Sequence, residues 1–231
     1  MKKTAFFFIL IGMAIHAIFI GALKLLKLDE ISGEVELIFG LFYFLVALIF
    51  KYIFEIEKSS IKEIKKRSDI LKSLNISEKL VLPKLDGRAT IFQAKNVFKS
   101  WIDFDFENWG LNKESKATQE TEIEVYEMVK DATFKEIFTS LSDNLDILCF
   151  TQGQIIDFCE KNCSHLRQDG CATFFLTKKD FEKPATEDNL FVVSVGVDVG
   201  SDGLGVSVGR FGNAGVWDAG YRHRVVVPKL S

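Results

Sequence analysis

The side chains best suited to metal binding lie between residues 159 and 171. Cys159, Cys163, His165 and Cys171 belong to the residue types that ligate zinc in proteins. Cys159 and Cys163 are four residues apart and would share one face of a helix. Their spacing matches no standard zinc-finger pattern, and Cys159 also suits the apolar face of that helix. We therefore expect no metal and no cofactor, and these four side chains are the candidate ligands if a metal binds.

The sequence offers no convincing pair of a nucleophile and a general base for nucleophilic catalysis. Cys163 and His165 are two residues apart, so on a helix their side chains point in different directions. The glycines between residues 196 and 209 lie within an expected hairpin, and they match neither the phosphate-binding nor the dinucleotide-binding pattern. Hydrolase, zinc-protease and kinase signatures are absent from the sequence. The sequence therefore favours a binding protein over an enzyme.

One candidate site for an anionic ligand remains. Arg222 and Arg224 flank His223 on an expected strand, which would place both guanidinium groups on one face. Asp198 lies at the end of the neighbouring hairpin. Solvated or paired arginines are the simpler interpretation of the same pattern.

Two apolar stretches near the N-terminus, residues 4–23 and 37–53, are each about long enough to cross a hydrocarbon core of about 30 Å. Lysines precede the first stretch and follow the second, with acidic residues between them. This pattern predicts a transmembrane hairpin over residues 1–54 of a multi-pass inner-membrane protein, with the N-terminus and the C-terminal domain in the cytoplasm. A cleaved signal peptide and a buried apolar hairpin are the alternatives; the length and uniform apolarity of the stretches disfavour both.

Residues 55–81 are expected to form a basic juxtamembrane helix and linker. Its basic side chains would either contact lipid headgroups or be solvated: Lys58, Lys62, Lys65, Lys66 and Arg67. The whole chain carries 29 basic and 32 acidic residues, a formal net charge of −3. An acidic balance disfavours a nucleic-acid surface. The expected partners are therefore the lipid bilayer and another protein, and an oligomer is possible.

Residues 82–231 are expected to form a cytoplasmic α+β domain. Apolar spacing predicts helices over residues 90–102, 118–129 and 134–141, and a further helix over 152–167. Thr151 and Gln154 form a capping-box pattern at the start of the last helix. Alternation predicts strands at 172–177, 189–199, 204–211 and 222–227. The predicted domain has N-terminal helices and a small, mainly antiparallel C-terminal sheet.

The two central strands are expected to pair as a hairpin. A turn at residues 200–203 would place Val197 opposite Val206 and Val195 opposite Val208. The opposite face would then carry mainly small residues: Ser194, Gly196, Gly205, Ser207 and Gly209. Either another element packs closely on this face or a ligand lies there.

The segments TQGQIIDFCEKNCSHLRQDGCATFFL and VGRFGNAGVWDAGYRHRVVVP resemble a family of uncharacterised proteins from small-genome candidate-phylum bacteria. The resemblance extends over about residues 82–229. It implies a bacterial origin and one structural unit over that range, and it implies no activity or site residue.

The expected function is a membrane-tethered binding or scaffolding module. The alternatives are a membrane-anchored enzyme acting on a small anionic substrate and a structural subunit of a membrane complex.

Overall fold

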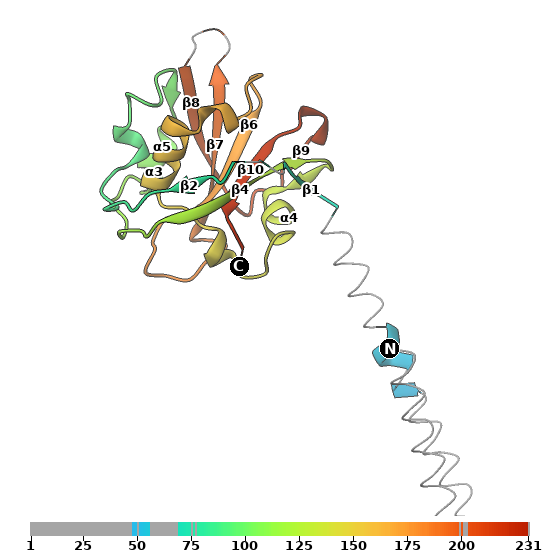
Figure 1. Ribbon diagram of the computed structural model, residues 1–231. Coiled ribbons are helices and arrows are strands. Elements are labelled where there is room, and N and C mark those ends of the chain that lie inside the picture. The colour runs from blue at the N-terminus through green and yellow to red at the C-terminus, as the bar shows by residue number, and fades with distance from the viewer. Residues whose placement is uncertain are drawn as a thin grey trace, which may run out of the picture. The chain divides into compact units, whose positions relative to one another are not determined.

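The structure is a computed structural model that describes residues 48–49, 51–55, 69–74, 76, 78–198, 200 and 203–230 (Figure 1). The chain divides into two compact units, Met1–Ile61 and Lys62–Ser231. In the first unit, residues 48–49 and 51–55 are helical and exposed. The fold and the candidate sites described below all belong to the second unit.

The prediction of a membrane-spanning hairpin is contradicted. Among the described residues, no helix is long and apolar enough to cross a membrane. Of the second apolar stretch, the structure describes residues 48–49 and 51–53, which are helical. Residues 4–23 and 37–47 lie outside the described residues, as do Lys58, Lys62, Lys65, Lys66 and Arg67. The predicted multi-pass inner-membrane localisation depended on this hairpin and is contradicted by the same finding.

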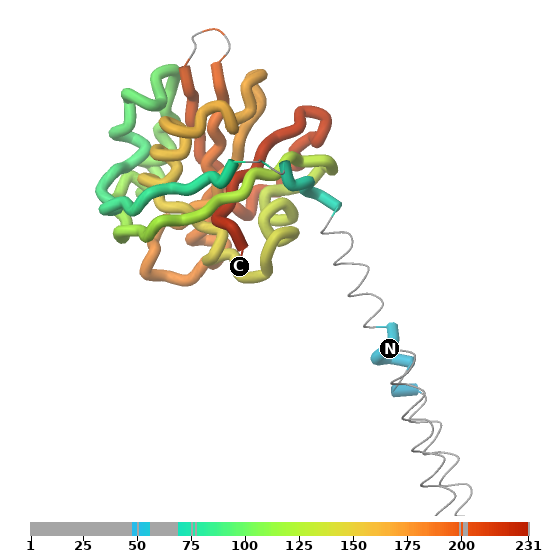
Figure 2. Tube along the Cα trace, viewed as in Figure 1, coloured from blue at the N-terminus to red at the C-terminus, as the bar shows by residue number. Residues whose placement is uncertain are grey.

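An eight-stranded mixed sheet forms the second unit (Figure 1). Its strands run in the order β1 (Leu71–Ser73), β4 (Thr121–Met128), β10 (Arg224–Pro228), β6 (Ala172–Lys178), β7 (Leu190–Asp198), β8 (Gly203–Arg210) and β3 (Trp101–Ile102). The pairs β10–β6 and β3–β8 are parallel, and the other neighbours are antiparallel. The eighth strand, β2 (Val81–Leu82), also pairs with β4. β1 pairs with the C-terminal end of β4 and β2 with its N-terminal end, so two short strands lie along one long strand (Figure 2). A separate two-stranded sheet joins β5 (Ala132–Thr133) to β9 (Val216–Trp217).

In the described part of the second unit, helices are few and short. They are α3 (Asp105–Asn108), α4 (Phe134–Thr139) and α5 (Gln152–Lys161), with 3-10 turns η2 (Ile91–Gln93), η3 (Leu145–Leu148), η4 (Cys163–His165) and η5 (Ala219–Tyr221). The predicted capping box is present at α5, where the Thr151 hydroxyl accepts from the Gln154 amide and the Gln154 side chain accepts from Thr151. A second capping box, between Thr133 and Glu136, starts α4.

The predicted fold class is wrong, because this is a mostly-sheet domain with a mixed sheet. Most of the predicted helix over residues 118–129 is the strand β4, Thr121–Met128. Its burial alternates: Ile123 and Val125 face one core, and Tyr126 and Met128 face the other. The helical spacing of Ile123 and Tyr126 arose by coincidence in a strand that is apolar on both faces. Residues 90–102 also form no continuous helix; they contain η2 and the edge strand β3.

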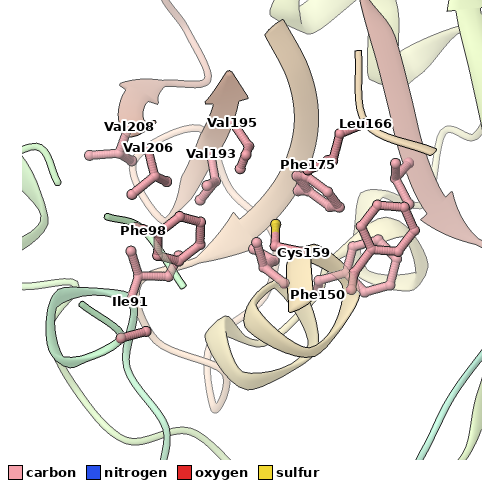
Figure 3. Packing of buried hydrophobic residues seen from close by; sticks show 14 of the residues in the cluster. Ile91, Phe98, Phe150, Cys159, Leu166, Phe175, Val193, Val195, Val206 and Val208 are labelled. Carbon is pink, nitrogen blue, oxygen red and sulfur yellow. The ribbon is translucent and has the colours of Figure 1, made fainter. Parts of the chain in front are cut away.

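Two hydrophobic cores cover opposite faces of the sheet. On one face, α5 packs Phe158 and Cys159 against Phe175 and Val195, as Figure 3 shows for part of this cluster. On the other face, α4 packs Phe134 and its neighbours against Phe174. The central strands are therefore buried on both sides.

The hairpin β7–β8 pairs two residues out of the expected register. Val195 lies opposite Val206, and Gly196 lies opposite Gly205. A shift of two residues leaves every side chain on its expected face, because side chains alternate with a period of two. The valines therefore still line one core, and the small residues still share the other face.

The glycines of that second face have different surroundings. A Cβ atom added to Gly205 would overlap the indole of Trp101, which lies across the strand. A Cβ atom on Gly209 would lie 3.1 Å from Cε2 of Phe134. A Cβ atom on Gly196 meets nothing within 4 Å. Close packing therefore accounts for two of the three glycines, and the face is open at the third.

We expect Gly205→Ala to destabilise the domain by about 1–3 kcal/mol, because the indole of Trp101 has to move. Gly196→Ala, at the directly opposite position, should leave stability unchanged or raise it slightly. Urea denaturation followed by tryptophan fluorescence measures both, and only Gly205→Ala should also shift the native emission. Equal effects of the two substitutions would contradict this packing.

Candidate ligand-binding pocket

A pocket of about 770 Å³ lies between two loops, a volume in the usual range of small-molecule sites. One loop, residues 111–118, is part of the connection between α3 and β4, and the other, residues 179–189, connects β6 to β7. We call it the loop pocket. Its lining residues are Lys113, Glu114, Ser115, Lys116, Gln152, Lys178, Lys179, Asp180, Phe181, Glu182, Lys183, Thr186, Asp188 and Asn189.

Gln152, the buried first residue of α5, fixes the first loop. Its amide nitrogen donates to the carbonyl of Leu111, and its amide oxygen accepts from the backbone N–H of Ile91 at 2.9 Å. The backbone N–H of Ser115 donates to the carbonyl of Gly87 at 2.8 Å. Gly87 has φ +81°, and a Cβ atom there would overlap the carbonyl of Ser115. This loop therefore depends on a glycine and a buried amide.

Asn189, which precedes β7, fixes the second loop. Its side-chain oxygen accepts from the backbone N–H of Asp180 at 2.9 Å, and its amide nitrogen donates to the carbonyls of Asp180 and Pro184 at 2.8 and 3.0 Å. The asparagine is buried, so these bonds are shielded from water. One side chain thus holds both ends of the segment 180–184.

Lys178 links the second loop to η3. Its side chain is 7% exposed, and its ammonium donates to Oδ1 of Asp146 at 2.6 Å and to the carbonyl of Lys183 at 2.9 Å. The hydrogen bond from Lys178 holds the pKa of Asp146 below its usual value. The ammonium group of Lys178 therefore stabilises the second loop.

Some of the other charged side chains of the loop pocket have partners within the protein, and others do not. Asp180 accepts from the backbone N–H of Glu182 and lies 3.4 Å from Nζ of Lys183, and these donors lower its pKa. Lys113, Lys116 and Lys179 form no ion pair within the part of the chain that the structure describes. They are exposed and come from both loops. At longer range, attraction from Lys113 helps to lower the pKa of Asp180, and attraction from Lys116 helps to lower that of Asp146. The three ammonium groups therefore reach a ligand without first breaking an ion pair, in a pocket whose walls are already fixed.

The predicted anion site at Arg222 and Arg224 is arranged differently. Nη1 of Arg224 donates to the carbonyls of His165 and Leu166, at 2.7 and 2.9 Å, so it caps the end of η4. Arg222 is exposed in a left-handed turn with φ 51° and does not belong to β10. The charges that act on Arg224 come from Arg167, Glu127 and Asp169.

Asp198 lies at the end of β7, where its Oδ1 accepts from the backbone N–H of Gly200. β6 lies between β7 and β10, and the strand pairing aligns Arg224 with Thr173 and Thr173 with Val195, three residues before Asp198. Arg224 and Asp198 therefore lie on strands that are not neighbours.

The four candidate zinc ligands are not gathered into one group, although Cys163 and His165 both lie in η4. Cys159 is buried in the core beside α5, and burial raises the pKa of its thiol. Cys163 is exposed on η4, and Cys171 precedes β6. Among the described residues, no three histidine, cysteine or acidic side chains are grouped so that they could hold a metal ion.

Sequence reasoning missed the loop pocket. Lys113 and Lys116 are more than sixty residues from Lys178 and Lys179 in the chain, and only the sheet topology brings the two loops together. A weak indication was present in the long polar connection between two clear strands, residues 179–189, because such loops often carry function.

Comparisons of the chain with protein-family models, with curated proteins and with solved structures gave no match.

Replacing Asn189 with alanine should destabilise the domain by about 1–3 kcal/mol, because the peptide groups of residues 180–184 lose a buried partner. Hydrogen exchange should accelerate first at Asp180. The matched control is Asn213→Ala, since Asn213 accepts only a local bond from the backbone N–H of Gly215 in an exposed turn. Urea midpoints compare the two variants, and equal shifts would contradict the role assigned to Asn189.

His223 should make the domain acid-sensitive. Its ring is buried against Phe174 and Trp217, and its Nδ1 accepts from the backbone N–H of Ala172 at 3.1 Å. Burial lowers its pKa below 6.5 in the folded chain, despite the nearby carboxylates of Asp218 and Asp169. As the pH falls, His223 is therefore protonated in the unfolded chain before it is protonated in the folded chain. The free energy of unfolding decreases as the pH falls from 6.5 through the folded pKa of His223.

The variant His223→Phe lacks this titration, so its free energy of unfolding should fall less than that of the native chain between about pH 7 and about pH 5. Urea denaturation at a series of pH values measures the difference. Parallel pH profiles for the two proteins would contradict the assignment.

Proposed function

We propose that this protein is a binding module that takes a small anionic ligand in the loop pocket. The observation that carries the proposal is the set of three unpaired ammonium groups, Lys113, Lys116 and Lys179, on two loops fixed by buried side chains. Lysine ammonium groups bind phosphate and carboxylate groups through charge-assisted hydrogen bonds. Fixed walls reduce the entropy lost when a ligand is ordered.

Several features favour binding over catalysis. Histidine and cysteine are absent from the lining of the loop pocket. Burial raises the pKa of the Cys149 thiol to about 12 and also raises that of Cys159, so neither thiol is an activated nucleophile. His223 accepts from a backbone amide and packs among aromatic rings, which occupies its Nδ1 in a structural role.

The acidic lining residues narrow the ligand class. Glu114, Glu182 and Asp188 place carboxylates beside the three free lysines. Carboxylates accept hydrogen bonds from hydroxyl or amino groups. A ligand with one anionic group and several hydroxyl groups, such as a sugar phosphate, satisfies both kinds of side chain.

Isothermal titration of the full chain with ribose 5-phosphate tests the proposal, with ribose and inorganic phosphate as the partial probes. The variant Lys113→Gln/Lys179→Gln removes one ammonium from each loop and should weaken binding about tenfold or more. The control Lys72→Gln/Lys130→Gln makes the same change in net charge at two exposed lysines outside the pocket lining, and it should bind like the native chain. Absence of binding, or equal losses in both variants, would refute the anionic-ligand site.

A further inference from the structure

A second hollow lies at the edge of the sheet, and it does not share residues with the loop pocket. It measures about 270 Å³ and is lined by Phe92, Lys95, Phe98, Lys99, Trp101, Ile102 and Phe104. We call it the edge hollow. We propose that the edge hollow docks an extended, acidic peptide segment of a partner protein through an aromatic or aliphatic anchor residue.

The aromatic rings of the edge hollow are unusually exposed. Phe104 is 70% exposed and Trp101 is 50% exposed, and the ring of Phe104 lies 6.1 Å from that of Phe92. Phe98 forms the buried floor. Exposed aromatic side chains gathered around one hollow are typical of a protein-binding surface, because rigid rings bury large apolar areas at low entropic cost.

The edge hollow lies beside an edge strand of the sheet. β3 is the last strand in the sheet order, and it pairs with β8 on one side only. No other strand lies against its outer side in the part of the chain that the structure describes. Extended peptides add to such edges by main-chain hydrogen bonding, while pockets beside the edge accept alternate side chains.

Charge decides the chemistry of the peptide. Lys95 and Lys99 are exposed and form no ion pair among the described residues, and no acidic side chain lines the edge hollow. The hollow is therefore apolar with a cationic rim, which complements an apolar anchor next to aspartate or glutamate.

A short edge strand beside lysines also protects a sheet against edge-to-edge association. Protection alone would be served better by polar side chains at positions 101 and 104 than by the exposed rings of Trp101 and Phe104. Single-stranded nucleic acid would use the same rings and lysines, but two lysines on a chain of net charge −3 provide little counterion release. The observations favour the peptide.

Fluorescence anisotropy of the full chain with a short fluorescein-labelled peptide tests the proposal. The peptide alternates phenylalanine or leucine with aspartate and glutamate. One control peptide carries lysine in place of the acids, a second carries alanine in place of the apolar residues, and a labelled oligothymidylate tests nucleic acid.

Two variants of the chain test the charged and the aromatic contributions to peptide binding separately. Lys95→Glu/Lys99→Glu reverses the rim charge, and Phe104→Ser removes the most exposed ring. Each should weaken binding of the acidic peptide about tenfold or more without changing the urea midpoint, since these side chains are exposed. Lys72→Glu/Lys130→Glu and Tyr221→Ser make the same chemical changes at exposed sites elsewhere and should bind normally.

Binding of the acidic peptide alone, lost in both edge variants and kept in both controls, supports the proposal. Absence of binding, equal loss in the control variants, or tighter binding of the oligothymidylate overturns it. Because the loop pocket is untouched by these substitutions, ribose 5-phosphate binding should be the same in every variant, which separates failure here from failure of the proposed anionic-ligand site.

Discussion

The burial of both faces of the central strands is the constraint on which the rest of this domain depends. Phe174 and Phe175 are consecutive in β6, and both are fully buried, one in each core. A strand of this kind is stable only when a layer covers each face of the sheet. α5 supplies one layer, and α4 with the β5–β9 ribbon supplies the other. The short helices suffice because η2, α3 and the connecting segments add buried residues to the first layer, among them Ile91, Phe98 and Phe106.

The same constraint determines where polar side chains can act. A buried polar group costs stability unless it is hydrogen-bonded, so the polar side chains at the border of the cores bind the nearest backbone. Gln152 binds the first loop, Asn189 binds the second, and Lys178 joins the second loop to Asp146. The rigidity of the sheet thus extends into two connections that would otherwise be held only at their ends. The loop pocket therefore results from the hydrogen bonds that these buried polar side chains make to the two loops.

The positions of the C-terminal strands and the start of α5 could be predicted because local patterns and tertiary environment agree there, whereas the mixed pairing of the sheet could not. The strands near residues 172–177 and 189–199 alternate or are continuously apolar, and the capping box at Thr151 specifies a helix start. β4 was misassigned because both of its faces are buried, so its apolar residues fit a helical spacing as well as a strand. The hairpin register depended on a choice between two turns one residue apart, which periodicity alone does not resolve.

The loop pocket could not be predicted in the same way, because its lining comes from distant parts of the chain. The lining of the edge hollow is local, residues 92–104, but its place at the edge of the sheet depends on the pairing of β3 with the distant strand β8. Trp101 lies across Gly205, and the parallel pairing of β3 with β8 makes that contact possible. The glycine that was expected to leave the sheet face bare therefore serves to seat an edge tryptophan, half of whose surface remains exposed. A bulkier residue at position 205 would force the indole away from the strand and alter the edge hollow. Gly205 thus contributes to the edge hollow indirectly, by setting the position of the Trp101 side chain that lines it.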